Sequence, residues 1–291
     1  MSAAAPAARR RAWQDPALLA PLTILLAALF LAPLLLMVPM SFREYDPGTG
    51  VVAGSWTLEN YSRLLTDEFY REVALRTLGL GLAVTACSLL LGYPLAYVIA
   101  RGNPRWRVTL VLLVVFPMML NLVVRSFGWI ALLSNHGLIN NLLVGLGLID
   151  TPLKLMFNLT GLIIGLTHIY LPFMVLMLVS SIQGVPRDVE AAASTLGCSR
   201  FHVFRAVTLP LTAPGILTGS ILVFVLTVSA LVTPRMLGGP TYKVMATLIY
   251  DEYMQLLDWP SGSALAFALT VVVLAFIWAS SRLAKRWGGM A

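Results

Sequence analysis

The stretch "VEAAASTLGCSRFHVFRAVTLP", from Val189 to Pro210, separates two strongly apolar segments of the chain. Its first part is rich in alanine, which favours helix, and it leads to Gly197, a residue typical of the position just past a helix end. Ser199 can cap a second helix, which Pro210 would end. The stretch therefore predicts two short helices around a glycine turn. Their smooth alanine face suits a groove on another protein better than a core of its own.

The segments around this stretch have the composition of a membrane protein. Of the 291 residues 58% are hydrophobic and 11% are charged, whereas soluble domains carry about 25% charged residues. Six apolar ranges are each long enough to cross roughly 30 Å of hydrocarbon as a helix. Helices are expected because a span in lipid must satisfy its own backbone polar groups. The six predicted spans are Leu18–Met40, Thr77–Ala100, Val108–Leu133, Leu159–Ile182, Leu211–Thr233 and Ser261–Ser281.

The positions of lysine and arginine predict how the chain is oriented. If both termini are cytoplasmic, the inner segments hold 12 of these residues in 62 positions, and the outer segments hold 7 in 88. Such an excess marks the cytoplasmic side. We therefore expect cytoplasmic tails at 1–17 and 282–291, a membrane domain over 18–281, and a cytoplasmic loop at 183–210. The basic residues lie in short blocks between apolar runs, as membrane topology requires. We therefore expect the chain to lie in a lipid bilayer and not to bind nucleic acid.

The loop resembles a motif of known transport proteins. Permeases of bacterial ABC importers carry the pattern E-A-A-x3-G-x9-I-x-L-P before their penultimate span, and this chain has valine in place of the isoleucine. The residues that we match to it are Glu190, Ala191, Ala192, Gly197, Val207, Leu209 and Pro210. The resemblance implies an all-α membrane protein with six transmembrane helices, the type I ABC importer permease fold. It also implies that this loop is the coupling helix, which docks in a cleft of a cytoplasmic ATPase.

Further stretches resemble the spermidine/putrescine branch of that family. They are "TLENYSRLL" (Thr57–Leu65), "LGYPLAYVIAR" (Leu91–Arg101), "HGLINNLLVGLGLIDTPLKLMF" (His136–Phe157), "YLPFMVLMLVSSI" (Tyr170–Ile182) and "DWPSGSA" (Asp258–Ala264). The resemblance implies a pathway for a polyamine. Related branches move iron, thiamine, 4-aminobutyrate or phosphonates through similar permeases, and those substrates stay open at this point.

The chain is not expected to be an enzyme. It has no G-x4-G-K-[ST] phosphate loop, so a partner must supply the energy. The resemblance implies an ABC ATPase dimer that uses ATP and Mg, a second permease subunit that is a paralogous chain, and a periplasmic substrate-binding protein. It places the chain in the bacterial inner membrane. The three scattered histidines have no metal-ligand spacing, so we expect no metal and no cofactor on this chain.

Polar residues within or beside the spans are the candidates for the substrate pathway. Arg125 lies inside the third predicted span. A charged residue within a span is a functional candidate, unless its side chain is long enough to place the charged group at the membrane–water interface. Trp129 lies one turn further, and Tyr170 lies within the fourth span. An arginine repels a cationic polyamine, so a packing or gating role suits Arg125 better than ligand binding.

A second group of candidates precedes the last span on the predicted outer side. Glu252, Asp258 and Trp259 combine carboxylates with an aromatic ring, which attract a polyamine through charge and cation–π contact. The alternative is a solvated loop that contacts the binding protein.

Two alternatives to a permease are an intramembrane protease and a secondary transporter. An intramembrane protease also has about six spans, but its G-x-S-G nucleophile motif is absent from this sequence. A secondary transporter usually carries inverted repeats with broken helix pairs, and none is evident here. Both would work as a single purified chain, whereas a permease would not.

Overall fold

The computed structural model describes residues 16–48 and 51–288, so most of the tail predicted at 1–17 and the end of the tail at 282–291 lie outside the described residues. The first elements are α1 (Pro16–Ser41), β1 (Arg43–Asp46), β2 (Val51–Trp56), α2 (Glu59–Thr66), α3 (Glu68–Arg101), α4 (Pro104–Val115), η2 (Phe116–Met119), α5 (Leu122–Leu133) and α6 (Leu138–Gly145). Then follow α7 (Leu159–Gly184), α8 (Arg187–Thr195), α9 (Arg200–Val203), η3 (Phe204–Thr208), α10 (Leu209–Leu211), α11 (Ala213–Val228), η4 (Pro234–Gly238), α12 (Met245–Asp251), η5 (Glu252–Leu256) and α13 (Trp259–Gly288).

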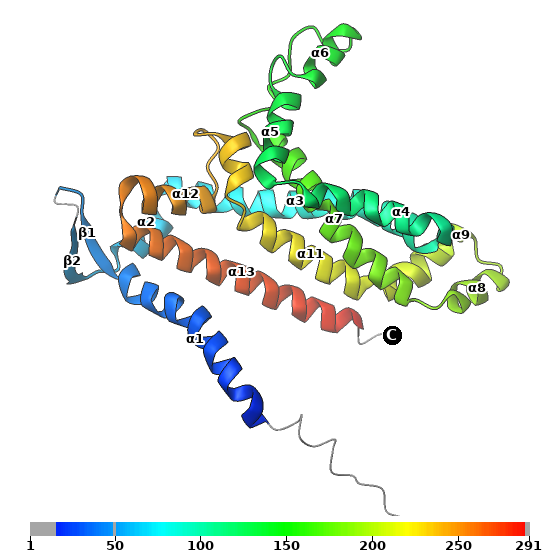
Figure 1. Ribbon diagram of the computed structural model, residues 1–291, viewed down its shortest axis with the longest axis horizontal. Coiled ribbons are helices and arrows are strands. Elements are labelled where there is room, and N and C mark those ends of the chain that lie inside the picture. Colours follow the sequence, from blue (N-terminus) through cyan, green and yellow to red (C-terminus); the bar gives the residue numbers. More distant parts are fainter. Residues whose placement is uncertain (1–15, 49–50, 289–291) are drawn as a thin grey trace, which may run out of the picture.

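The core lies between α3, α7 and α11, which run side by side along the long axis of the molecule (Figure 1). Val84, Leu166 and Leu178 are fully buried there. Small residues allow the helices to approach, because a Cβ at Gly92 would lie 3.2 Å from Met174. Helix α13 packs along α11. At this contact the ring of Phe224 on α11 stacks on the ring of Phe276 on α13, with 3.7 Å between the ring centroids.

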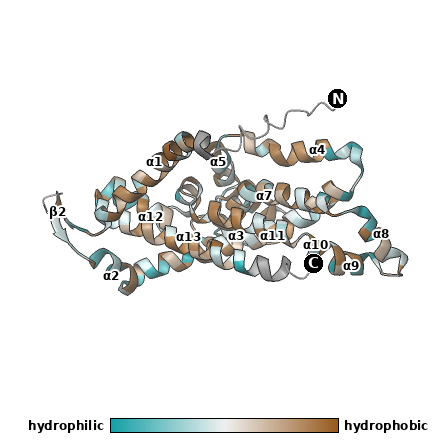
Figure 2. Ribbon diagram, turned by 90° about the horizontal axis from the view of Figure 1, so that it is seen from below, coloured by the Kyte–Doolittle hydropathy of each residue, from teal (hydrophilic) through white to brown (hydrophobic). Residues whose placement is uncertain are grey.

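Most of the predicted spans are confirmed. Five described helices are long and apolar enough to cross a membrane, or six if one bent pair counts as a single span. The first, second, fourth and sixth predicted ranges fall within α1, α3, α7 and α13. Their outer faces are apolar, as a bilayer solvent requires; Leu36 of α1, for example, is 73% exposed. Figure 2 shows hydrophobic ribbon along these helices and hydrophilic segments at the β2 and α8 ends.

The third predicted span is wrong as a single helix. Within Val108–Leu133 the helix α4 ends at Val115, a short 3-10 turn follows, and α5 begins afterwards. Pro117 lacks the N–H that a continuing helix needs. The side chain of Asn121 accepts a hydrogen bond from Val123 N at 2.8 Å and so caps a new helix. As a result α5 and α6 project away from the bundle (Figure 1).

The fifth predicted span, Leu211–Thr233, is shorter than expected. Its helix α11 ends at Val228, and irregular backbone separates it from η4. At its other end, the helical stretch Arg200–Leu211 meets α11 at an angle of 64°. Pro214 in the first turn of α11 suits a helix start but not a continuous helix through this point.

The end of the molecule that carries β1 and β2 is predicted to lie outside the membrane. The two strands form an antiparallel pair with Arg43 opposite Trp56, and the guanidinium of Arg43 lies 4.8 Å from the centre of that ring. Helix α2 follows, and α12 and η5 lie at the same end (Figure 1). These elements lie against the ends of α3 and α13 that are predicted to be outside.

Candidate functional site

The loop between α7 and α11 has the predicted form of two short helices around a glycine turn. Helix α8 ends before Gly197, whose φ of 85° lies in the left-handed region that favours glycine. The hydroxyl of Ser199 accepts a hydrogen bond from His202 N at 3.3 Å and caps α9. Both predictions about this turn are therefore confirmed.

The second helix of the loop does not end at Pro210. It continues through the π-helical segment η3 into α10 and reaches Leu211. At the end of η3 the N–H of Leu209 donates a hydrogen bond to Phe204 O, five residues earlier. The next residue is Pro210, which has no N–H and so donates no hydrogen bond to the preceding turn.

The acid of this loop lies one place away from the family pattern. Four residues, not three, separate Ala192 from Gly197. Counted back from the glycine, the position of the acid is held by Ala191, and Glu190 precedes it. The match at Val207, Leu209 and Pro210 keeps the pattern's spacing.

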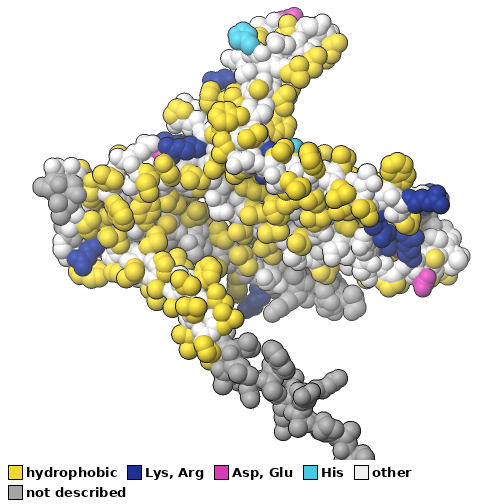
Figure 3. All heavy atoms as spheres, in the orientation of Figure 1, with side chains coloured by type: hydrophobic (Ala, Val, Ile, Leu, Met, Phe, Trp, Pro, Cys, Tyr) yellow, Lys and Arg dark blue, Asp and Glu magenta, His cyan; other side chains and the backbone are white. Residues whose placement is uncertain are grey.

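The tip of the loop presents apolar surface. Ala191 and Ala192 are exposed, and Leu196 and Phe201 are 84% and 71% exposed. The spacing of Phe201 and Phe204 at i and i+3 predicts one apolar face for both, but Phe204 packs against Tyr93 and Tyr97 of α3 while Phe201 is exposed. Figure 3 shows basic side chains gathered at this end of the molecule. The loop thus offers an apolar surface with positive charge around it.

Of the matched residues at the end of the loop, only Leu209 packs against the core of the bundle. Val207 and Leu209 are half-buried, and Leu209 packs against the hydrophobic core, while Pro210 is exposed. A role for any of the seven matched residues in docking stays a prediction.

The pathway candidates fall into two separate groups. The first lies between α5 and α7. Nε1 of Trp129 donates a hydrogen bond to Nδ1 of His168 at 3.1 Å, and Tyr170 packs on Phe173. The Nε and Nη1 atoms of Arg125 are buried and form no hydrogen bond with the described residues.

The second group lies where α12, η5 and α13 meet. Glu252 is only 4% exposed, and its Oε1 accepts a hydrogen bond from the hydroxyl of Tyr70 at 3.3 Å. Asp258 accepts from Ser261 N at 2.9 Å and so caps α13. Burial and then the charge of Asp258 raise the pKa of Glu252, and burial raises the pKa of Asp258 itself. Trp259 is half exposed and packs edge-on against Tyr253.

An ion-pair cluster beside this second group was not predicted. Asp251 accepts from Arg235 at 3.2 Å and lies 3.0 Å from the ammonium of Lys243. Arg235 also lies 4.1 Å from the ring centre of Tyr250. Arg235, Lys243 and Asp251 line a cavity of about 280 Å³. In the sequence Asp251 is one of three acids between the fifth and sixth predicted spans, and nothing in the pattern indicates that two cations neutralise it.

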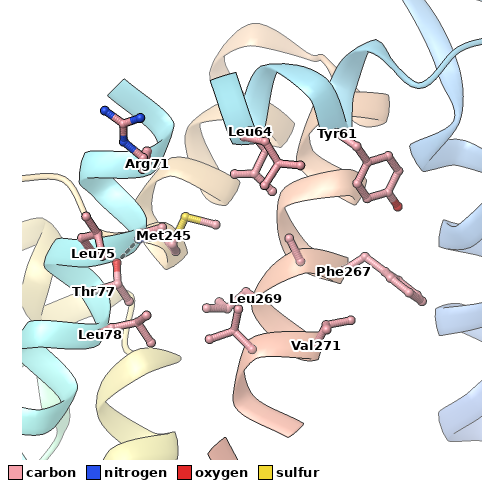
Figure 4. A pocket seen from close by; sticks show the side chains of 14 residues that line it. Tyr61, Leu64, Arg71, Leu75, Thr77, Leu78, Met245, Phe267, Leu269 and Val271 are labelled. Carbon is pink, nitrogen blue, oxygen red and sulfur yellow. Dashed lines mark hydrogen bonds between the residues drawn. The ribbon is translucent and has the colours of Figure 1, made fainter. Parts of the chain in front are cut away.

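A separate apolar cavity of about 470 Å³ lies between α2, α3 and α13. Figure 4 shows Leu64, Leu78 and Leu269 around it, with Arg71 at its edge. None of the residues matched to the motif lines it, and neither do the pathway candidates. The hydrogen bond drawn there, from Met245 N to the hydroxyl of Thr77 at 2.8 Å, ties α12 to α3.

Comparison with known proteins gives the family. Residues 88–288 match the model of the family described as binding-protein-dependent transport system inner membrane component. The chain is 36% identical over 257 residues to the spermidine/putrescine transport system permease protein PotB of Escherichia coli, covering 87% of this chain and 93% of that protein. It is 33% identical over 255 residues to PotB of Haemophilus influenzae, covering 88% of each.

Solved structures agree on the fold. A bacterial ABC transporter involved in the import of the acidic polysaccharide alginate matches with a TM-score of 0.73 at 20% identity, covering 95% of this chain and 96% of that one. The MetNI methionine ABC transporter matches with a TM-score of 0.58 at 16% identity, covering 76% and 99%. The predicted type I ABC importer permease fold is therefore confirmed. The chain belongs to the family of binding-protein-dependent transport system inner membrane components, and it is a permease subunit of an ABC importer.

Proposed function

We propose that this permease carries spermidine or putrescine, delivered by a periplasmic binding protein. The observation that carries the proposal is the 36% identity with PotB over most of both chains. The outer end of the structure is compatible with a cation, because the buried carboxylate of Glu252 lies there beside Asp258 and the exposed ring of Trp259. Carboxylates and aromatic rings both attract organic ammonium groups.

The energy comes from an ATPase dimer that binds ATP and Mg and docks on the loop formed by α8, Gly197 and α9. The exposed alanines of α8 and the exposed side chains of Leu196 and Phe201 support this docking site. Exposed apolar surface is unfavourable in water and commonly marks a site where another protein binds. The chain itself has no nucleotide-binding loop. ATP binding draws the two ATPase subunits together and moves the loop. The pathway then switches from an inward-facing to an outward-facing state by a rigid-body, two-state transition.

A second, paralogous permease subunit completes the pathway. Helix α5 projects from the bundle and exposes Val124 and Phe127 at 60% each. Its Trp129 faces α7, where it donates a hydrogen bond to His168, and Arg125 lies one turn earlier on α5. In this arrangement Arg125 has a packing or gating role, because an arginine repels a polyamine.

The orientation can be tested by thiol labelling. Both native cysteines, Cys87 and Cys198, are first replaced by alanine. A cysteine at the exposed position Thr241 should then react with an impermeant maleimide added to intact spheroplasts. A cysteine at Leu196, which is 84% exposed, should react only after the membrane is opened. Labelling of Leu196→Cys in intact spheroplasts would reverse the topology and remove the ATPase docking site from the cytoplasm.

The role of the outer carboxylates can be tested by neutralising them. The double variant Glu252→Gln with Asp258→Asn keeps the hydrogen-bond acceptors for Tyr70 and Ser261 but removes both charges. We expect uptake of radiolabelled spermidine by proteoliposomes of the complete complex to fall about ten-fold, roughly the effect of losing 1.4 kcal/mol of attraction. ATPase activity without substrate should survive. Because the pKa of Glu252 is raised, wild-type uptake should also fall as the pH drops, beginning at a higher pH than for an ordinary glutamate.

A matched control removes two exposed acids from the same side, as Glu68→Gln with Asp150→Asn, and should leave uptake nearly unchanged. Equal uptake by both double variants would show that Glu252 and Asp258 are structural. If the wild-type complex imports no polyamine but imports iron, thiamine, 4-aminobutyrate or a phosphonate, the substrate proposal is wrong.

A further inference from the structure

The docking helix α8 is joined to α3 by a largely buried ion pair. Arg101 is the last residue of α3, and its Nη2 donates to Oε1 of Glu190 at 2.9 Å. The same nitrogen donates to the carbonyl of Val185 at 2.9 Å, just before α8 begins. The two side chains are only 11% and 16% exposed. The pair therefore lies between the elements and not on the surface of the loop.

A chain of hydrogen bonds extends this contact into the bundle. The hydroxyl of Thr208 donates to the same Oε1 of Glu190 at 2.9 Å. The carbonyl of Thr208 accepts from the hydroxyl of Thr212 at 2.9 Å, and that hydroxyl is 2.8 Å from the hydroxyl of Tyr93 on α3. Both ends of the loop are thus tied to α3, one through Glu190 and one through Thr212.

Among the described residues, Arg101 and Glu190 each form an ion pair only with the other. Nε of Arg101 is buried without a hydrogen-bond partner, so the guanidinium depends on Glu190 for compensation. Removing one member of a buried pair leaves the other charged and desolvated, which costs more than losing an exposed pair. Arg187 and Arg200, also on this loop, are exposed and form no ion pair with the described residues.

The shifted position of the acid explains why it faces inward. Successive residues of an α-helix are about 100° apart around its axis. The family pattern places its acid at the position that Ala191 occupies here, which is exposed. One place earlier, Glu190 faces α3 and leaves the outer side of α8 to alanines.

We propose that Arg101 is a positioning residue that fixes the docking helix to α3, so that a displacement of α8 moves α3 as part of the same body. The inference rests on the proposed function of the loop as the ATPase docking site. It predicts that Glu190 acts through Arg101 and not through a direct contact with the ATPase.

A double-mutant cycle in the reconstituted complex tests this. The variants are Arg101→Gln, Glu190→Gln and both together, with Arg105→Gln as a matched control because Arg105 lies four residues further in the same inner segment and is exposed. We expect each single variant to lower the substrate imported per ATP hydrolysed by about ten-fold. The double variant should be no worse than either single one, because both changes remove the same interaction. Multiplied effects in the double variant would overturn the proposal. Should Arg101→Gln fail to assemble, Thr208→Val removes one bond of the same network and should lower the ratio in the same direction.

A second measurement needs no ATPase. A fluorescent probe is attached to Cys198, in the turn between α8 and α9, in a Cys87→Ala background. In the purified permease, Arg101→Gln and Glu190→Gln should lower the probe's anisotropy equally, while Arg105→Gln should not. An unchanged anisotropy in the first two variants would overturn the proposal. If the wild-type complex shows no ATP-driven import, the proposed function fails, and the Cys198 measurement still decides whether Arg101 fixes the loop.

Discussion

Replacing Gly197 with valine should abolish ATP-driven uptake while the permease still inserts in the membrane at normal levels. The φ of Gly197 is 85°, and no atom lies within 4 Å of a Cβ built there, so the effect comes from the backbone and not from a clash. A left-handed conformation costs a residue with a Cβ about 1–2 kcal/mol, and a β-branched side chain is the least suited to it. The turn can avoid this strain by moving α8 relative to α9, which misplaces the docking surface.

The measurement is uptake by proteoliposomes together with copurification of the ATPase. Gly184→Val is the matched control, because its Cβ also meets no atom within 4 Å but its φ is not positive. Gly197→Asn should keep part of the activity, since asparagine tolerates the left-handed region better than valine. Normal uptake by Gly197→Val would mean that this turn does not position the loop.

Much of the fold was predictable because the bilayer imposes a simple pattern. A span must be helical and apolar over its whole length, so α1, α3, α7 and α13 are evident in the sequence. The break between α4 and α5 was missed because Pro117 and Asn121 interrupt an apolar run without changing its overall composition. Hydropathy shows how much of a chain is apolar, whereas the cap at Asn121 is a property of one side chain.

The turn of the docking loop could be predicted because its causes are local in the sequence. The attachment of the loop to the bundle could not be predicted. Glycine and serine at a turn have local conformational causes, so Gly197 and Ser199 could be assigned from the sequence. The pairing of Arg101 with Glu190 joins residues 89 positions apart. In the sequence Arg101 was only one of several basic residues on the inner side. The same limit hid the contact of Asp251 with Lys243, because a pattern of charges does not show which ones meet.

The contact between α7 and α11 makes the second strong prediction. Gly215 lies in the first turn of α11, and a Cβ there would fall well inside van der Waals contact with Cβ of Ser181 on α7. That neighbour is fixed to its backbone and cannot rotate away. We expect Gly215→Leu to prevent assembly of the complex, and Gly215→Ala to destabilise the permease by about 1–3 kcal/mol, the usual cost of overpacking.

Gly79→Ala is the control that separates packing from helix propensity. Gly79 lies in α3, and a Cβ there meets no atom within 4 Å. Alanine is the better helix former by about 1 kcal/mol, so Gly79→Ala should keep or raise the melting temperature of the detergent-solubilised permease. Gly215→Ala gains the same propensity yet should melt at a lower temperature, because Ser181 must move. An equal or higher melting temperature for Gly215→Ala would show that α7 and α11 can separate without cost. The bend before α11 would then not depend on this close approach.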